Sequence, residues 1–278
     1  MMIRQVDECY KEVMSNLEKK IWPSRFEPND KLWYPHLDER CVEIPWALSR
    51  YQGQKKILEI GLALADLMLV KAQIQLKQLG EAKLYALDIV EIDRVLNRFD
   101  KLDVNIRGLY HFTQGDARNS LLNDNSFDLI FLISTLEHIG FDEFEPDKSL
   151  ETVFKRPSEY PDKFPDYNDC HEDRKALTEI KRILSPGGSL LLTVPFGKRG
   201  ICISKDSKGL WAFYKEYSLT AWRKLVEESG LLMVDERFFF YDDRKGWIES
   251  TVPEDLCKIE CSIEAPVKCV VCAELKKG

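Results

Sequence analysis

From residue 56 onward, short continuous apolar runs alternate with segments that have the spacing of amphipathic helices. Apolar strands that alternate with helices are typical of a parallel sheet covered by helices on both faces. The pattern therefore predicts an α/β fold built around a mostly parallel sheet. The predicted strands are 56–61, 83–89, 110–116, 127–133 and 189–196, and the predicted helices are 67–80, 90–99 and 173–184.

The last part of the chain has a different pattern. Residues 218–230 have helical spacing, with Ser218 as the N-cap and Gly230 at the C-terminal end. Two long strand patterns follow at 231–242 and 265–277, joined by an irregular stretch with no predicted helix. Because no helix separates these two strands, we expect them to pair antiparallel.

The first fifty residues predict a separate N-terminal part. Apolar residues in 1–21 recur mostly at gaps of three and four, which is typical of an amphipathic helix. Residues 22–46 are rich in proline and aromatic residues and have no clear period, so they predict an ordered arm. We therefore divide the chain into 1–50, a helix and aromatic arm, and 51–278, the main domain. Two interpretations of the helix stay open, a cover over the ligand site and a dimer contact.

An acidic, proline-rich segment at about 139–171 interrupts the alternation. It leaves the C-terminal end of a central strand, which is where open α/β sheets bind ligands. A loop of this length is usually functional or disordered. Two interpretations stay open, a lid over the ligand site and a surface insertion. Aromatic residues of the arm and of this segment either stack on sugar faces or pack in the fold: Trp22, Trp33, Tyr34, Trp46, Tyr160 and Tyr167.

Composition excludes several classes of protein. Hydrophobic residues make up 44% and charged residues 31% of the 278 residues, which is ordinary for a globular protein. The formal net charge of −7 argues against a protein that grips nucleic acid backbones. No apolar run approaches the ~20 residues of a membrane helix, and the N-terminus lacks a signal-peptide pattern. We therefore expect a cytoplasmic protein with no membrane span and no nucleic acid partner.

The eight cysteines do not predict a zinc site. Cys257 and Cys261 have a C-x3-C spacing, and Cys269 and Cys272 have a C-x2-C spacing. The second pair lies in a strand pattern, where residues three apart face opposite sides. Without a turn to bring the two sulfurs together, buried reduced cysteines are the better interpretation.

The first strand-to-helix turn, after Glu59, is suited to a ligand. A helix N-terminus offers free N–H groups and a partial positive charge to a polar or anionic group. Only Gly61 is present of a Gly-x-Gly-x-x-Gly fingerprint, and Ala63 and Ala65 follow it. A methyl group at the second position crowds a pyrophosphate. The turn therefore disfavours a nicotinamide dehydrogenase and favours a ligand that lacks a pyrophosphate.

Two aspartates follow the next two strands. Asp88 ends the second strand, where a carboxylate can accept hydrogen bonds from both hydroxyls of a ribose. Asp116 follows Gly115 after the third strand, within reach of an adenine amino group. Taken singly, each aspartate is equally explained as a solvated strand-end residue or an Asx turn.

The ordered segments ILEIG, ALDI, GDA, FDLIFLISTLEHI and RILSPGGSLLLTVPFG resemble the class I S-adenosylmethionine-dependent methyltransferases. The methyltransferases of glycan biosynthesis are more similar still, because they have a segment like RCVEIPWALSR before the first strand. The resemblance covers about residues 40–278. It implies a Rossmann-like seven-stranded sheet in the order 3-2-1-4-5-7-6 with strand 7 antiparallel. It also implies S-adenosyl-L-methionine as cofactor and S-adenosyl-L-homocysteine as product.

The resemblance also implies the cofactor-binding residues. Gly61 matches the position beside the methionine part of the cofactor, and Asp88 matches the ribose-binding acid. Asp116 and Ala117 match the adenine-side motif, whereas Ser134 lies near the sulfonium. The complete set that the resemblance implies is Glu59, Gly61, Leu62, Ala63, Asp88, Ile89, Asp116, Ala117, Ser134 and Leu136.

The expected reaction is methyl transfer to a hydroxyl of a sugar, nucleotide sugar or glycan end. A sugar hydroxyl is a poor nucleophile, so it needs a general base within hydrogen-bond reach. His138, just past the fourth strand, is the candidate, since the ordinary pKa of histidine suits this role. The alternative is that Glu137 and His138 only pack the turn.

Other functions stay open at this point. One is a methyltransferase for another small molecule or a protein side chain, and another is a non-catalytic binding or scaffold protein. A metal-dependent subgroup of these methyltransferases has a glutamate where this chain has Ser134, so no metal site is predicted. His171, Glu172 and Asp173 are the residues that could supply later metal ligands. The expected partners are a small-molecule or glycan acceptor and a second copy of the chain.

Overall fold

A computed structural model describes residues 39–78, 80, 82–101, 104–140, 171–198, 200–205, 211–242, 246–256 and 267–278. The predicted helix at 1–21, most of the aromatic arm and nearly all of the segment at 139–171 lie outside the described residues. So do Cys257 and Cys261. Trp46 is the only predicted stacking aromatic among the described residues.

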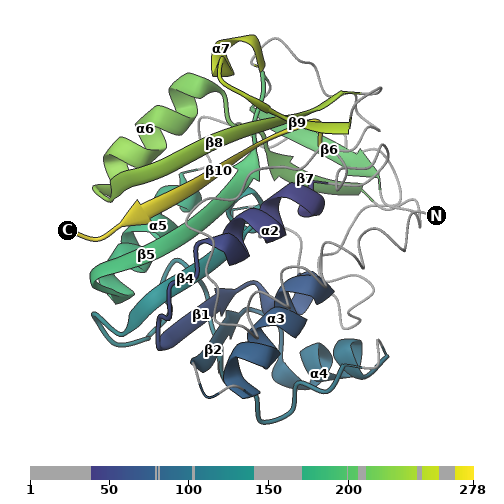
Figure 1. Cartoon of the computed structure of the whole chain (residues 1–278), viewed down its shortest axis with the longest axis vertical. Helices are drawn as coiled ribbons and strands as arrows, with labels where there is room; N and C mark the ends of the chain where they lie inside the picture. Colours follow the sequence, from purple (N-terminus) through teal and green to yellow (C-terminus); the bar gives the residue numbers. More distant parts are fainter. Residues whose placement is uncertain are drawn as a thin grey trace.

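The core of the fold is an eight-stranded sheet in the order β3-β2-β1-β4-β5-β10-β8-β9 (Figure 1). Neighbouring strands among β1 to β5 are parallel, whereas β10 is antiparallel to both β5 and β8. The first seven positions confirm the predicted order, because β8 and β10 are the sixth and seventh predicted strands. The strands are β1 (Lys56–Ile60), β2 (Lys83–Asp88), β3 (Tyr110–Gln114), β4 (Phe127–Ile133), β5 (Leu184–Pro195), β8 (Leu232–Asp242), β9 (Gly246–Ser250) and β10 (Cys269–Lys276).

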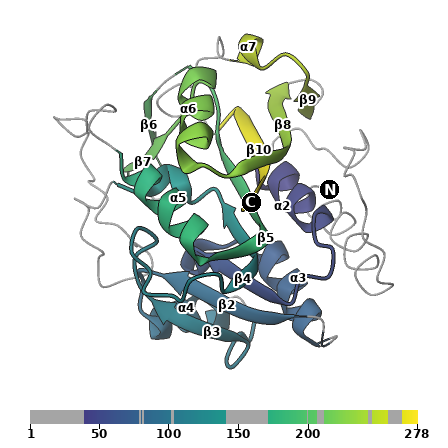
Figure 2. The same ribbon diagram turned by 90° about the vertical axis from the view of Figure 1, so that its left-hand side faces the viewer.

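Helices cover both faces of this sheet, as the alternation predicted. Helices α2 (Arg40–Ser49) and α3 (Leu67–Gln78) lie on one face, and α5 (Glu172–Ile183) and α6 (Leu219–Ser229) lie on the other (Figure 2). A further helix, α4 (Ile92–Lys101), packs against α3 and β2 through Val95 and Phe99. The sheet is therefore buried between two helical layers.

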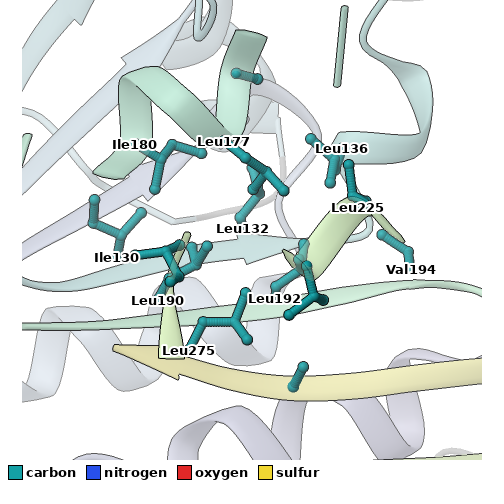
Figure 3. Packing of buried hydrophobic residues seen from close by; sticks show 14 of the residues in the cluster. Ile130, Leu132, Leu136, Leu177, Ile180, Leu190, Leu192, Val194, Leu225 and Leu275 are labelled. Atoms are coloured by element: carbon teal, nitrogen blue, oxygen red, sulfur yellow. The ribbon is translucent and has the colours of Figure 1, made fainter. Parts of the chain in front are cut away.

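The two faces of the sheet have separate apolar cores. On the α5 and α6 side, Ile130 and Leu132 of β4 pack against Leu177 of α5 and Leu225 of α6 (Figure 3). The intervening β4 residues Leu129 and Phe131 pack on the α2 and α3 side, because successive strand residues face opposite sides.

The two cysteines of β10 follow the same rule. Cys269 is buried in the core beside α5 and α6, and Cys272 is buried in the core beside α2 and α3. The strand spacing therefore places the two sulfurs on opposite faces of the sheet, as predicted.

The predicted cap of α6 is confirmed at both ends. The Ser218 side chain accepts a hydrogen bond from the backbone N–H of Ala221 at 3.3 Å, and Gly230 adopts the left-handed conformation at the C-terminal end. Strand β5 differs from its prediction, since it begins at Leu184 and includes the Pro186-Gly187-Gly188 stretch that was expected to precede it.

Several elements were not predicted. Residues 40–49 form α2, although Pro45 and the aromatic residues around it indicated an arm. Strands β6 (Ile201–Lys205) and β7 (Trp211–Lys215) form a separate antiparallel pair. The stretch between β8 and β10 contains β9 and the short helix α7 (Pro253–Leu256), so the prediction that it holds no helix was wrong.

The position of α2 bears on the predicted division of the chain into residues 1–50 and 51–278. Val42, Ile44 and Trp46 are fully buried in the core on the α3 side, together with residues of β1 and β4. The boundary at residue 50 stays a prediction, but α2 packs as part of the described fold. No helix among the described residues is long and apolar enough to cross a membrane.

Candidate active site

A cavity opens at the C-terminal ends of β1, β2 and β4. In the sheet, β2 lies on one side of β1 and β4 lies on the other side, so the strand order reverses direction at β1. Ligands bind at such positions in open α/β sheets, because the loops there diverge and leave a crevice. The residues that line it come from α2, from these strand ends and from the loop after β3. They include nine of the predicted site residues, namely Glu59, Gly61, Ala63, Asp88, Ile89, Asp116, Ala117, Ser134 and His138.

Gly61 is required by the backbone at the turn after β1. Its φ of +91° lies in the left-handed region, where side chains are strained. A Cβ at this position would lie 2.7 Å from Thr135 Oγ1 and 2.9 Å from Thr135 Cγ2. The missing side chain therefore lets the β1 turn approach the β4 turn, and it leaves room at the bottom of the cavity.

The two alanines after Gly61 meet no such constraint. Ala63 lies in the short 3-10 helix η1 (Leu62–Leu64), and Ala65 has an ordinary φ of −55°. The backbone N–H of Ala63 donates to Asp88 Oδ2 at 2.6 Å. The turn therefore needs only one glycine for its backbone conformation, which explains why the rest of the fingerprint is absent.

Asp88 lies at the end of β2 with both carboxylate oxygens held by backbone donors. Oδ2 accepts from Ala63 and Oδ1 accepts from Val90 N–H at 2.9 Å. Burial raises the pKa of Asp88, and these backbone hydrogen bonds partly oppose that rise. Each oxygen has a further lone pair, so the fixed carboxylate can still accept from a hydroxyl in the cavity.

Asp116 has a different environment from the one its motif suggested. Its two oxygens accept from the guanidinium of Arg118, with Nη2 to Oδ2 at 2.5 Å. Burial tends to raise the pKa of Asp116, but the hydrogen bonds and charge of Arg118 lower it overall. Arg118 also donates to Glu172 Oε2 at 2.9 Å, which ties the loop after β3 to the start of α5.

Glu59 is buried beneath the Gly61 turn and lines the same cavity. Its Oε2 accepts from Gln73 Nε2 at 2.6 Å, and Gln73 Oε1 accepts from Tyr110 Oη at 2.6 Å. Burial raises the pKa of Glu59 to about 8, against the smaller lowering effects of Gln73 and Arg40.

Helix α2 contributes charged residues that the sequence did not single out. Arg40 lines the cavity, and its Nη1 donates to Glu43 Oε2 at 2.6 Å. Glu43 is fully buried and accepts from Ser134 Oγ, at 2.8 Å and 2.9 Å for its two oxygens. Ser134 has a φ of +39°, which is uncommon for a residue with a side chain. The Glu43 contact therefore holds α2 against the strained end of β4.

His138 lies at the end of the short 3-10 helix η2 (Leu136–His138), with its side chain 41% exposed in the cavity. Its ring meets that of Tyr214 edge-on, with the ring centroids 6.4 Å apart. The preceding Glu137 is buried, and its Oε1 lies 4.0 Å from His138 Nε2. The imidazole is thus accessible on one side and packed on the other.

Two predicted residues do not line the cavity. Leu62 is fully buried in the core with α3 and α4, and Leu136 is buried among residues of β4 and α5 (Figure 3). Conversely, Leu64 and Ile89 line the cavity, and these residues are 49% and 41% exposed. Exposed apolar side chains at a cavity suit the flat face of a ligand.

The residues of the metal-dependent alternative are engaged elsewhere. Glu172 pairs with Arg118 and with Lys175. Asp173 pairs with the buried Lys215 at 3.0 Å and accepts from Tyr217 Oη at 2.9 Å. Within the described residues, no three His, Cys, Asp or Glu side chains are grouped to hold a metal ion.

The described residues fit a nucleoside with an amino-acid tail. A fixed carboxylate at Asp88 suits ribose hydroxyls, and the apolar rim at Leu64 and Ile89 suits a base. The close approach at Gly61 leaves space at the end of β1 for the rest of such a ligand.

Residues 70–155 match a family model described as a methyltransferase domain. No curated protein matches the chain. Among solved structures, an S-adenosylmethionine-dependent methyltransferase from Methanosarcina mazei is 15% identical with a TM-score of 0.49, covering 81% of this chain and 94% of that chain.

Two further structures have a similar extent of overlap. A Burkholderia thailandensis 1,6-didemethyltoxoflavin-N1-methyltransferase with bound S-adenosylhomocysteine is 13% identical with a TM-score of 0.43, covering 81% of this chain and 73% of that chain. An Aquifex aeolicus S-adenosylmethionine-dependent methyltransferase is 15% identical with a TM-score of 0.42, and the match covers 81% of this chain and 83% of that chain.

The family match coincides with the part of the chain that builds β2, β3, β4 and much of the cavity. The strand order and the fit of the cavity to a nucleoside agree with it. Residues 70–155 thus match a methyltransferase domain, and the sheet has the strand order predicted from the resemblance to class I methyltransferases.

Proposed function

We propose that this protein is an S-adenosylmethionine-dependent methyltransferase that transfers a methyl group to a hydroxyl of a sugar, a nucleotide sugar or a glycan end, with His138 as the general base. The observation that carries the proposal is the position of His138. Its half-exposed imidazole lines the same cavity as Gly61 and Asp88. A general base must come within hydrogen-bond reach of the acceptor hydroxyl, and an exposed imidazole in this cavity supports that role.

The choice of a sugar is supported by helix α2. The segment that resembles glycan-biosynthesis enzymes, residues 40–50, forms this helix and lines the cavity through Arg40 and Ile44. Arg40 and His138 both line the cavity, where polar side chains can contact hydroxyl groups.

The cofactor roles are proposed residue by residue. Asp88 accepts hydrogen bonds from the ribose, while Leu64 and Ile89 contact the base. Asp116 accepts from the adenine amino group with its second lone pairs, while Arg118 fixes its orientation. Gly61 and Glu59 lie beside the methionine part, and Ser134 lies near the reacting carbon.

In the proposed reaction, the acceptor hydroxyl transfers one proton to His138. The cofactor supplies an activated methyl group when it is bound. As the acceptor oxygen bonds to the methyl carbon, the bond from that carbon to sulfur would break and leave S-adenosylhomocysteine, and the hydroxyl proton would pass to an imidazole nitrogen of His138. Holding the reacting atoms in line is the main contribution of the cavity.

The proposal predicts that His138→Gln loses methyl transfer by about 10²–10⁴-fold, because one general base contributes that much. The assay follows labelled methyl transfer from S-adenosylmethionine to a panel of nucleotide sugars and simple glycosides. Binding of S-adenosylhomocysteine, measured by calorimetry, stays within about twofold of wild type, since His138 is not a proposed cofactor ligand.

His111→Gln is the matched control, because His111 is exposed on β3 and does not line the cavity. It is expected to retain full activity. Methylation of primary amines or carboxylates without any hydroxyl acceptor contradicts the proposed substrate. Full activity of His138→Gln on a sugar contradicts the proposed base.

Two further parts of the proposal concern the whole protein. We expect it to act in the cytoplasm on a small-molecule or glycan acceptor, without nucleic acid. A homodimer is also expected, and sedimentation equilibrium tests it directly.

A further inference from the structure

Glu43 is a fully buried carboxyl in a helix whose packing on the sheet is mainly apolar. Its neighbours Val42, Ile44 and Trp46 already pack α2 into the core beside β1 and β4. Removing a carboxyl from water is costly, and well-packed apolar residues often stabilise a fold at least as well. The anchoring of α2 alone is therefore a weak reason for a carboxyl at this position.

Glu43 contacts two side chains that line the cavity, although it does not line the cavity itself. Arg40, one turn earlier on α2, donates from Nη1 to Glu43 Oε2 at 2.6 Å. Ser134, just after β4, donates from Oγ to the two carboxyl oxygens at 2.8 Å and 2.9 Å. One buried carboxyl thus holds a guanidinium of the helix and a hydroxyl of the strand end in a single arrangement.

The backbone of Ser134 is fixed as well as its side chain. Its N–H donates to Thr193 of β5, at 3.0 Å to Oγ1 and at 3.2 Å to the carbonyl oxygen. These contacts and the Glu43 contact hold Ser134 at its φ of +39°. Uncommon backbone conformations persist only where the surroundings determine them, and they are frequent at active sites. The Glu43 contact therefore concerns the site as well as the fold.

A second buried carboxyl, that of Glu137, lies near Arg40. Burial raises the pKa of Glu137 well above its ordinary value, which favours the neutral form of this carboxyl. A neutral group attracts a guanidinium only weakly at a distance. Glu43, in contrast, orients Arg40 through a direct hydrogen bond.

We propose that Glu43 is a positioning residue, which acts on the bound ligand through Arg40 and Ser134 without touching it. This inference rests on the proposed function, in which the cavity binds the cofactor and Ser134 lies near the reacting carbon. Side chains behind a site keep the groups that contact the ligand in place. A displacement of about 1 Å in such a group can lower a rate by about 10²-fold.

The test is titration calorimetry of the full chain with S-adenosylhomocysteine, which requires no known acceptor. Glu43→Gln keeps the size of the side chain but replaces one accepting oxygen by a donating NH2 group. We expect the Kd to rise by about tenfold, the effect of losing roughly one hydrogen bond to a charged group. Methyl transfer to the panel of nucleotide sugars and glycosides is expected to fall by roughly 10–100-fold.

Glu43→Asp is a milder second variant. It keeps an accepting carboxyl but moves it one methylene away from its two partners. The Kd is expected to rise in the same direction by a smaller factor, because the hydrogen bonds lengthen without being replaced by a donor.

Asp235→Asn is the matched control, since it weakens a polar contact of α2 that lies outside the cavity. Arg50, at the C-terminal end of α2, donates from Nη2 to Asp235 Oδ2 of β8 at 2.6 Å, and neither residue lines the cavity. This variant is expected to lower the Tm and to leave the Kd unchanged. A loss of stability alone does not alter the affinity of the molecules that remain folded.

A further variant follows the effect through Ser134. In Ser134→Ala the hydroxyl that Glu43 holds is absent. Adding Glu43→Gln to this variant is expected to raise the Kd by a smaller factor than it does in wild type, because residues that act through one contact are not additive.

A wild-type Kd in both Glu43→Gln and Glu43→Asp overturns the inference. An equal loss of affinity in Asp235→Asn assigns the effect to the packing of α2 and overturns it as well, as does a full effect of Glu43→Gln in the Ser134→Ala variant. Failure of the proposed function gives a different result. Wild type then binds S-adenosylhomocysteine but methylates only acceptors without a hydroxyl, and the Kd values still decide the role of Glu43.

Discussion

At the scale of single residues, the burial of Glu59 makes the stability of this fold depend on pH. Its pKa rises from 4.5 to about 8 in the folded chain. Between these two values the folded state holds a proton that the unfolded state has released. The free energy of unfolding therefore falls as the pH rises from about 4.5 toward 8.

Glu59→Gln is expected to remove this dependence. The glutamine keeps an oxygen that accepts from Gln73, but it has no proton to lose. Relative to the variant, wild type loses about 5 kcal/mol of stability across this pH range, since one pKa unit corresponds to about 1.4 kcal/mol. Urea unfolding at a series of pH values measures the difference. Parallel curves for the two proteins would show that Glu59 ionises normally in the fold.

Single residues also show what the motifs at the strand ends predicted and what they missed. Gly61, Asp88 and Ala63 come together at one turn, and the backbone N–H of Ala63 donates to Asp88. Their spacing in the sequence predicted a shared cavity because the ends of adjacent parallel strands meet at one edge. The pairing of Asp116 with Arg118 is a local contact that the motif alone did not indicate.

At the scale of elements, a buried hydrogen bond between Glu43 and Ser134, 91 positions apart in the chain, joins α2 to the end of β4 in addition to the apolar packing of α2. Neither residue type is unusual in its own segment. The pairing depends on α2 lying over the end of β4, so the sequence pattern around Pro45 could not predict it. Helix α2 was missed because proline and aromatic residues obscure its period.

The losses in free energy of unfolding caused by Glu43→Gln and by Ser134→Ala are expected to be coupled. A hydrogen bond to a buried charged group contributes about 1.5–3 kcal/mol, so the double variant should lose less than the sum of the single losses. Denaturant unfolding of the four proteins gives the coupling energy. The exposed pair Arg107 and Asp100 is the control, with about 0–1 kcal/mol expected. Strictly additive losses would mean that the Glu43 contact does not anchor α2.

At the scale of the whole molecule, a bound cofactor is expected to stabilise the fold. S-adenosylhomocysteine at about 100 times its Kd contributes ~2.7 kcal/mol. For a chain of this size, that corresponds to a rise in Tm of roughly 5–10 °C. Asp88→Asn is expected to lose most of the shift, because it removes the charge that accepts from the ribose.

Asp100→Asn, on the exposed side of α4, is expected to keep the full shift. Scanning calorimetry of the three proteins with and without ligand measures this. No shift in wild type at millimolar ligand would contradict the assignment of the cavity to this cofactor. An equal shift in Asp88→Asn would contradict the role of Asp88 alone.

The sequence by itself determined the sheet and most of the strand-end residues that line the cavity. Period, caps and strand-end residues are local signals, and parallel strands bring them to one edge whatever else the chain does. Helix α2, the β6–β7 pair and β9 were decided only by tertiary structure. So were the contacts of Glu43 and Glu137, because burial and distance between remote segments set their charges and partners.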